Sequence, residues 1–165
     1  MNRAQRRHAG KPSRINHAAR QALNAPTLHH TMNRFMPFTT AELLALQIPV
    51  RSAFESLRTG HGTEPDFHTL AAAVNTALIR SESIDPLCVE TCQRAQAALI
   101  GVLARFKRCG AWGVDHHALQ DIPPALDLHE QLLELSSPLQ MANAMKETLA
   151  RMNSGHVFRG EGAPL

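Results

Sequence analysis

Apolar residues along most of the chain recur every three or four positions, which is the spacing of an amphipathic helix. The clearest stripe follows Thr63 and consists of Phe67, Leu70, Ala71, Val74 and Leu78. A longer stripe follows Asp85-Pro86 and consists of Cys88, Cys92, Ala95, Leu99, Val102, Leu103 and Phe106. No stretch alternates apolar and polar residues between turns, as a half-buried strand would. The pattern predicts an all-α protein.

Residues that favour helix ends divide this pattern into separate helices. Four polar residues stand where N-caps are expected, namely Thr39, Thr63, Asp85 and Ser137. Thr39 forms a capping-box pattern with Glu42, and prolines after Asp85 and Ser137 fit the first helical turn. Glycines that favour C-caps follow three of the stripes, at Gly60, Gly110 and Gly155. The sequence therefore predicts a compact bundle of about five helices with short connections.

Prolines leave two of these helices less defined. Pro49 breaks, kinks or restarts the helix that opens at Thr39 and continues through Val50, Phe54 and Leu57. Residues 110–124 are expected to form a connector with one helical turn near 117–120, and Pro124 to open a helix that ends at Leu135. In the final helix, the predicted apolar residues are Leu139, Ala142, Met145, Leu149 and Met152.

The chain of 165 residues fits one folded domain with terminal extensions. Residues 1–38 are interpreted as a flexible basic arm and linker, with a short helix allowed by the pattern at 13–24. The helical bundle is expected over residues 39–155. Residues 156–165 are interpreted as a loose tail.

Charge is distributed unevenly between the arm and the body. Residues 1–41 hold seven basic and no acidic side chains, whereas residues 42–165 hold ten basic and fourteen acidic ones. The sequence pI of about 9.1 thus describes a basic arm on a mildly acidic body. Six arm residues are predicted to neutralise nucleic-acid phosphates without reading sequence: Arg3, Arg6, Arg7, Lys11, Arg14 and Arg20. The alternative is that the arm is only a solubilising leader.

No segment of the sequence suits a membrane or a secretory signal. The longest apolar-or-Gly run, from Ala97 to Ala104, is far shorter than the roughly 20 residues of a transmembrane helix. The first 23 residues lack the apolar stretch of a signal peptide. Three cysteines, an odd number in one helical stretch, do not resemble a secreted disulfide framework. A cytoplasmic protein with no membrane partner is expected.

Cysteine and histidine are the residue types that could bind a metal or act in acid–base catalysis. Cys88, Cys92, Cys109 and His116 are four groups that zinc accepts, but the spacing of Cys88 and Cys92 along an apolar stripe favours core positions. His116, His117, His129 and Glu130 are the other candidate metal or acid–base cluster. Their spacing matches no metalloprotease motif, and surface or first-turn histidines are the preferred interpretation. We therefore expect no metal, no cofactor and no catalytic residue.

Methionines occupy the final helix at Met141, Met145 and Met152. Their expected place is the core. If exposed, they would offer an adaptable surface to a protein partner.

Two internal segments and the N-terminus resemble a known group of proteins. The segments are FESLRTGHGTEPDFHTLAAAVNTALI, residues 54–79, and LDLHEQL, residues 126–132, and the N-terminus is MNRAQRR. Over residues 40–155 the chain resembles small helical proteins of proteobacterial prophages and plasmids, some described as regulators of the factor-for-inversion-stimulation type. The regulator label would imply a basic recognition helix, but the helix after Thr63 has only Arg80 as a basic residue.

These observations favour a non-enzymatic accessory protein of a mobile genetic element. Its helical body would bind a protein partner or itself, and its arm would add non-specific affinity for nucleic acid. A dimeric nucleic-acid-binding regulator is the first alternative. A small enzyme using His116, His117 or His129 is the second.

Overall fold

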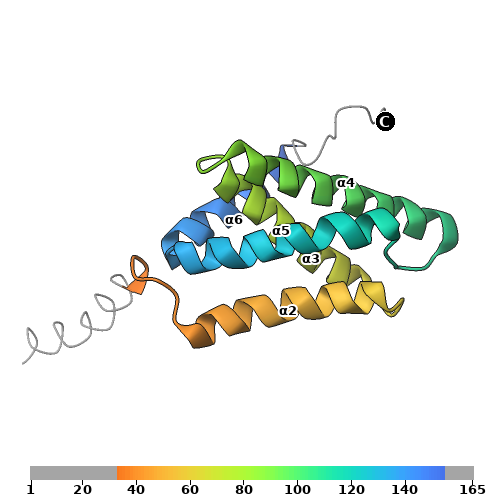
Figure 1. Cartoon of the computed structure of the whole chain (residues 1–165), viewed down its shortest axis with the longest axis horizontal. Coiled ribbons are helices and arrows are strands. Elements are labelled where there is room, and N and C mark those ends of the chain that lie inside the picture. Colours follow the sequence, from red (N-terminus) through yellow and green to blue (C-terminus); the bar gives the residue numbers. More distant parts are fainter. Residues whose placement is uncertain (1–32, 155–165) are drawn as a thin grey trace, which may run out of the picture. The chain divides into compact units, whose positions relative to one another are not determined.

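The computed structural model describes residues 33–154, and its contacts divide the chain into two units, Met1–Met36 and Pro37–Leu165. In the second unit, the described residues contain five α-helices and no strand (Figure 1). The helices are α2 (Thr40–Arg58), α3 (Glu64–Ser81), α4 (Pro86–Cys109), α5 (His116–Leu135) and α6 (Pro138–Asn153). The predicted all-α fold of five helices is thus confirmed. The expected short helix at 13–24 and the tail at 156–165 lie outside the described residues.

The four predicted N-cap residues cap the first turns of α2, α3, α4 and α6. Thr39, Thr63 and Ser137 each form a capping box with the third residue of the helix that follows. The Asp85 carboxylate accepts a hydrogen bond of 2.6 Å from the Leu87 amide. Each cap satisfies backbone N–H groups that would otherwise lack a partner, so local sequence fixes where these helices begin.

The turn between α2 and α3 depends on two glycines. Gly60 adopts a left-handed φ of 78°, which costs glycine least. Gly62 lies so close to Leu57 that a Cβ atom there would overlap the Leu57 side chain and stand 3.0 Å from the Leu57 Cα atom. This tight turn brings the start of α3 back onto α2.

Helix α3 is the centre of the bundle and packs against each of the other four helices. Five consecutive α3 residues, 73–77, are buried. Successive helical residues point about 100° apart, so a run of five covers every side of the helix. Each of the other four helices therefore covers one part of the surface of α3.

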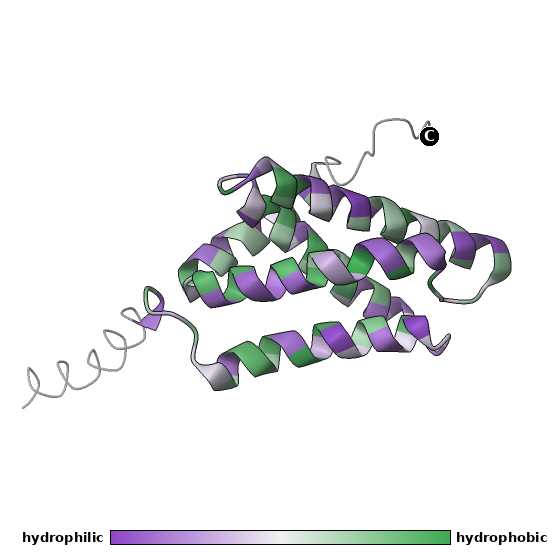
Figure 2. Ribbon diagram, viewed as in Figure 1, coloured by the Kyte–Doolittle hydropathy of each residue, from purple (hydrophilic) through white to green (hydrophobic). Residues whose placement is uncertain are grey.

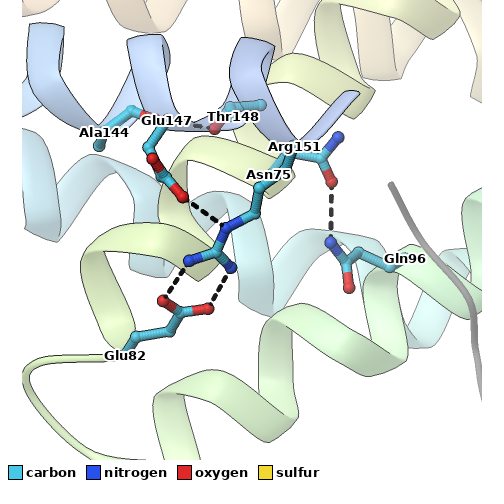
Figure 3. Close-up of polar contacts among 7 residues, drawn as sticks. All are labelled: Asn75, Glu82, Gln96, Ala144, Glu147, Thr148 and Arg151. Carbon is cyan, nitrogen blue, oxygen red and sulfur yellow. Dashed lines mark hydrogen bonds and ion pairs between the residues drawn. The ribbon is translucent and has the colours of Figure 1, made fainter. Parts of the chain in front are cut away.

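The interior is apolar in one part and partly polar in another. The large cluster joins α2, α3, α4 and α5 and includes the fully buried Leu57, Leu70, Ile122 and Leu126. A smaller cluster joins Ala77, Cys92 and Leu132. On α3 and α4, the buried amides of Asn75 and Gln96 are linked by a hydrogen bond of 2.8 Å (Figure 3). This pairing satisfies polar atoms that would be costly to bury alone.

Pro49 neither breaks nor restarts α2, which runs through it without interruption. Proline has no N–H to donate to the carbonyl four residues earlier, which belongs to Ala45. Ala45 is exposed, so the missing hydrogen bond lies at the surface of the bundle and not in its core. The helix therefore tolerates the proline.

The prediction that α5 opens at Pro124 is wrong, because α5 begins at His116 and contains both Pro123 and Pro124. The Asp115 side chain accepts a hydrogen bond of 2.9 Å from the Ala118 amide and caps the helix there. Inward positions on both sides of the prolines are buried, at Ala118, Ile122, Ala125 and Leu126. Tertiary burial thus outweighs the local cost of two interior prolines, each about 3 kcal/mol.

The cap at Asp115 gives a direct test of this helix start. We predict that Asp115→Ala lowers the free energy of unfolding by about 1 kcal/mol, because the first turn of α5 loses its cap. Glu134→Ala, at an exposed position of the same helix, should change it by less than about 0.5 kcal/mol. Denaturant unfolding followed by circular dichroism measures both. Equal, negligible effects would show that α5 does not begin at His116.

Candidate interaction surface

The predicted phosphate-binding residues Arg3, Arg6, Arg7, Lys11, Arg14 and Arg20 all lie outside the described residues. On the body, four arginines form ion pairs with carboxylates, namely Arg51, Arg58, Arg94 and Arg151. Within residues 37–154, the cations without such a pair are Arg80, Arg105, Lys107, Arg108 and Lys146. Three of them stand near the end of α4, where cations also stabilise the helix dipole.

The three cysteines do not come together. Cys92 is fully buried, Cys88 is half-buried and Cys109 is exposed. α4 is continuous, so Cys92 and Cys109 are separated by 17 residues, or about 25 Å of helix. Burial raises the pKa of the Cys92 thiol to about 11, so the thiol stays protonated near neutral pH. The predicted core position is confirmed for Cys92. Cys88 is only half-buried, so it lies at the edge of the core.

The histidines are also apart. His116 and His117 are exposed in the first turn of α5, with ring centroids 6.0 Å apart, as the first-turn interpretation predicts. His129 lies 12 residues further along the same helix, or about 18 Å. Among residues 33–154, no three or more His, Cys, Asp or Glu side chains form a group that could hold a metal ion.

The expectation that His129 lies on the surface is wrong, because its side chain is 6% exposed. It follows Ile122 and Leu126 on the inward side of α5. The Nδ1 atom has no hydrogen-bond partner among the described residues. Burial lowers the pKa of His129 to about 4, with Glu130 opposing the shift and Arg51 adding to it. The ring is therefore neutral near pH 7.

Helix α6 presents an apolar stripe to solvent. The predicted face of this helix is largely exposed, at Ala142, Met145, Leu149 and Met152, with Leu139 half-buried. The buried positions are instead Met141, Ala144 and Thr148. Both sets have the spacing of a helical stripe, and they lie side by side on the helix. α6 therefore carries an uncovered apolar stripe beside the stripe that packs on α3.

The covered side of α6 is held to α3 by specific polar contacts (Figure 3). Arg151 donates two hydrogen bonds of 2.5 and 2.8 Å to the Glu82 carboxylate and a third of 2.9 Å to Glu147. These bonds hold the pKa of Glu82 below its usual value. Thr148 donates to the Ala144 carbonyl, which allows its hydroxyl to be buried. The polar contacts and the buried stripe together set which side of α6 faces α3.

The first half of α2 is rich in apolar residues (Figure 2), and it forms a second exposed apolar region. Residues 41–49 are apolar except for Glu42 and Gln47. Leu44 is 49% exposed, Leu46 41% and Ile48 61%. The second half of the helix is tied to the bundle by Arg51, which pairs with Asp127 and Glu130 of α5 at 2.5 and 2.6 Å. α2 is thus anchored at one end and uncovered at the other.

Comparisons with known proteins give no relative. No family model, no curated protein and no solved structure matches the chain. None of the helices between residues 33 and 154 has the length and apolar character needed to cross a membrane.

The buried His129 predicts a pH-dependent stability. Its pKa is about 4 when folded and about 6.5 when unfolded, so its contribution is complete above pH 6.5 and is lost as the pH falls towards 4. That loss amounts to about 3 kcal/mol. His129→Leu should remove this part of the pH dependence, whereas the exposed His117→Leu should keep it. Denaturant unfolding at several pH values measures the difference, and identical pH profiles for His129→Leu and the parent would contradict the assignment.

Proposed function

We propose that this is a non-enzymatic accessory protein of a mobile genetic element. Its helical body binds another protein or a second copy of the chain, and its basic arm adds non-specific affinity for nucleic acid. The observation that carries the proposal is the exposed apolar stripe of α6, at Met145, Leu149 and Met152. The mobile-element context is part of this proposal and comes only from the likeness that the sequence of residues 54–79 and 126–132 suggests.

The α6 stripe has the chemistry of a helix-binding surface. Its residues follow the i, i+4, i+7 spacing by which one helix contacts another. Covering each large apolar side chain contributes up to about 1.5–3 kcal/mol relative to leaving it in water. Methionine suits such a surface, because its unbranched, polarizable side chain adapts to the shape of the partner. A partner that presents an amphipathic helix fits this stripe.

The arm supports the nucleic-acid part of the proposal by its charge. Residues 33–154 hold ten basic and thirteen acidic side chains, and four of the arginines are already paired with carboxylates. The body thus has a net negative charge, and its unpaired cations Arg105, Lys107 and Arg108 near the end of α4 are fewer than those of the arm. The first twenty residues carry six cations and no carboxylate. Lysine and arginine bind phosphates by releasing counterions, which gives affinity for any sequence.

We predict that duplex DNA binding depends on the arm and falls steeply with salt. Six engaged cations would give a log–log salt slope near −5, since each phosphate contact adds about 0.9. Replacing Arg6, Arg7 and Lys11 with Ala should reduce the slope by about 3. The loss should be equal on two unrelated duplexes, because phosphate contacts carry no sequence information. Fluorescence anisotropy at several salt concentrations measures it.

The matched control for this experiment is Arg105, Lys107 and Arg108 replaced together by Ala. It removes the same two arginines and one lysine, but from the end of α4. The arm assignment requires the control to keep most of the slope. A larger loss from the control than from the arm variant would place the site on the body. Absence of binding by the parent protein would remove nucleic acid from the proposed function.

Two neighbouring α6 residues test whether the stripe is open in the free protein. Met145→Glu should change the free energy of unfolding by less than about 1 kcal/mol, because Met145 is 53% exposed and both residues favour helices. Ala144→Glu should lower it by more than about 3 kcal/mol, because Ala144 is buried against α3. Denaturant unfolding of the full chain measures both. If Met145→Glu proves equally damaging, the stripe is covered by the protein itself and is not a docking surface.

A further inference from the structure

The outer side of the first half of α2 forms a second apolar stripe, distinct from that of α6. It consists of Ala41, Leu44, Ala45 and Ile48, all exposed. The same helix buries Val50, Ala53, Phe54 and Leu57 on its inner side. We call the four exposed residues the α2 outer stripe. A helical segment that is apolar on all sides is normally covered on all sides.

Charges around the α2 outer stripe are already satisfied within the chain. Residues 43–50 contain no charged side chain. Glu42 is occupied by its capping bonds to Thr39, at 2.8 Å from the Thr39 amide. Further along the helix, Arg51 is paired with α5, and Glu55 is paired with Arg58 at 2.7 Å. A surface that covers this stripe need not supply a counter-charge, and a second copy of the stripe meets no charge repulsion there.

We propose that two copies of the chain associate through the α2 outer stripe, with the two α2 helices antiparallel across a two-fold axis. This rests on the proposed function, since it names a second copy as a partner of the helical body. With the axis between Leu44 and Ala45, Leu44 of one copy faces Ala45 of the other. Ile48 then faces Ala41 of the other copy. Large side chains meet small ones at each level, as close helix packing requires.

Self-complementarity is the reason for choosing a second copy as the occupant. An isologous interface needs a patch that matches itself after a two-fold rotation. The stripe meets this condition, because its two large and two small residues exchange places under the rotation. It also buries no unpaired charge. A partner with a charged helix would leave its charge unanswered by residues 43–50.

The size of the stripe sets the strength of the association. Its eight-residue span extends about 12 Å along the helix. Stable interfaces bury about 800 Å² on each partner, which is more than such a span provides. The dimer is therefore weak and reversible, and it forms as protein concentration rises.

Pairing of this kind would bring the starts of two α2 helices near each other. In the antiparallel register, the first residues of the two α2 helices, Thr40 in each copy, lie within about 20 Å of one another. Each helix is preceded in sequence by the basic arm. Two linked arms on one nucleic acid raise the apparent affinity through effective concentration. The dimer would thereby strengthen non-specific binding without any sequence-reading contact.

Sedimentation velocity over a range of concentrations tests the association with the full chain. The parent should pass from monomer to dimer with a dissociation constant below about 1 mM, and Ile48→Glu should remain monomeric. Leu149→Glu, which places the same charge on the exposed α6 stripe, should still form the dimer. Circular dichroism melts should show all three proteins folded. A parent that stays monomeric, an Ile48→Glu variant that still dimerises, or a Leu149→Glu variant that does not would overturn the proposal.

A cross-linking experiment tests the register. With Cys88 and Cys109 changed to Ser, Ala45→Cys should form a disulfide-linked dimer under mild oxidation, because the two copies of residue 45 lie beside the axis. Ala104→Cys, an exposed position on α4, should not. Equal cross-linking by both would contradict the α2 register. The salt slope of the arm and the stability of Met145→Glu are measured independently, so a failure of the dimer leaves the test of the proposed function intact.

Discussion

Burial of α3 on all sides is the constraint on which the rest of the fold depends. Residues 73–77 leave no side of this helix free, and α2, α4, α5 and α6 each pack against it. A central helix of limited length cannot cover four neighbours completely. α4 and α5 also pack against each other, whereas α6 relies chiefly on α3. The apolar surface that α3 cannot cover remains on the outer helices.

The exposed apolar stripes of α2 and α6 result because α3 cannot cover all of the apolar surface of its neighbours. α6 is fixed by Arg151, Glu82 and the buried Ala144, so its second stripe lies beside the covered one and stays exposed. α2 is fixed by Arg51 near its middle and by Leu57 at its end, so its first half lies beyond the large apolar cluster. Exposed apolar stripes on well-anchored helices are characteristic of surfaces that bind other proteins. This is the physical basis of the proposed interaction role.

Local signals in the sequence predicted the helices well, but signals that depend on tertiary packing did not. Caps such as Thr63 and Ser137 act within one turn, so they could be located from sequence alone. Pro123 and Pro124 indicated a helix start, yet burial of Ile122 keeps α5 continuous through them. Periodicity predicted one apolar face of α6, but that face is largely exposed, because α6 packs on α3 through Met141, Ala144 and Thr148 instead. The burial of His129 was missed for the same reason, and the arm residues lie outside the described part of the chain.

The central claim is that the α6 stripe is open in the free protein, and methionine oxidation tests it most directly. The full chain at low concentration would be treated with hydrogen peroxide, and the rate at each methionine followed by mass spectrometry. Met145 and Met152 should oxidise nearly as fast as in the unfolded chain, and Met141, which is 7% exposed, several-fold more slowly. Equal protection of all three methionines in the dilute protein would contradict the account, because the stripe would then already be covered.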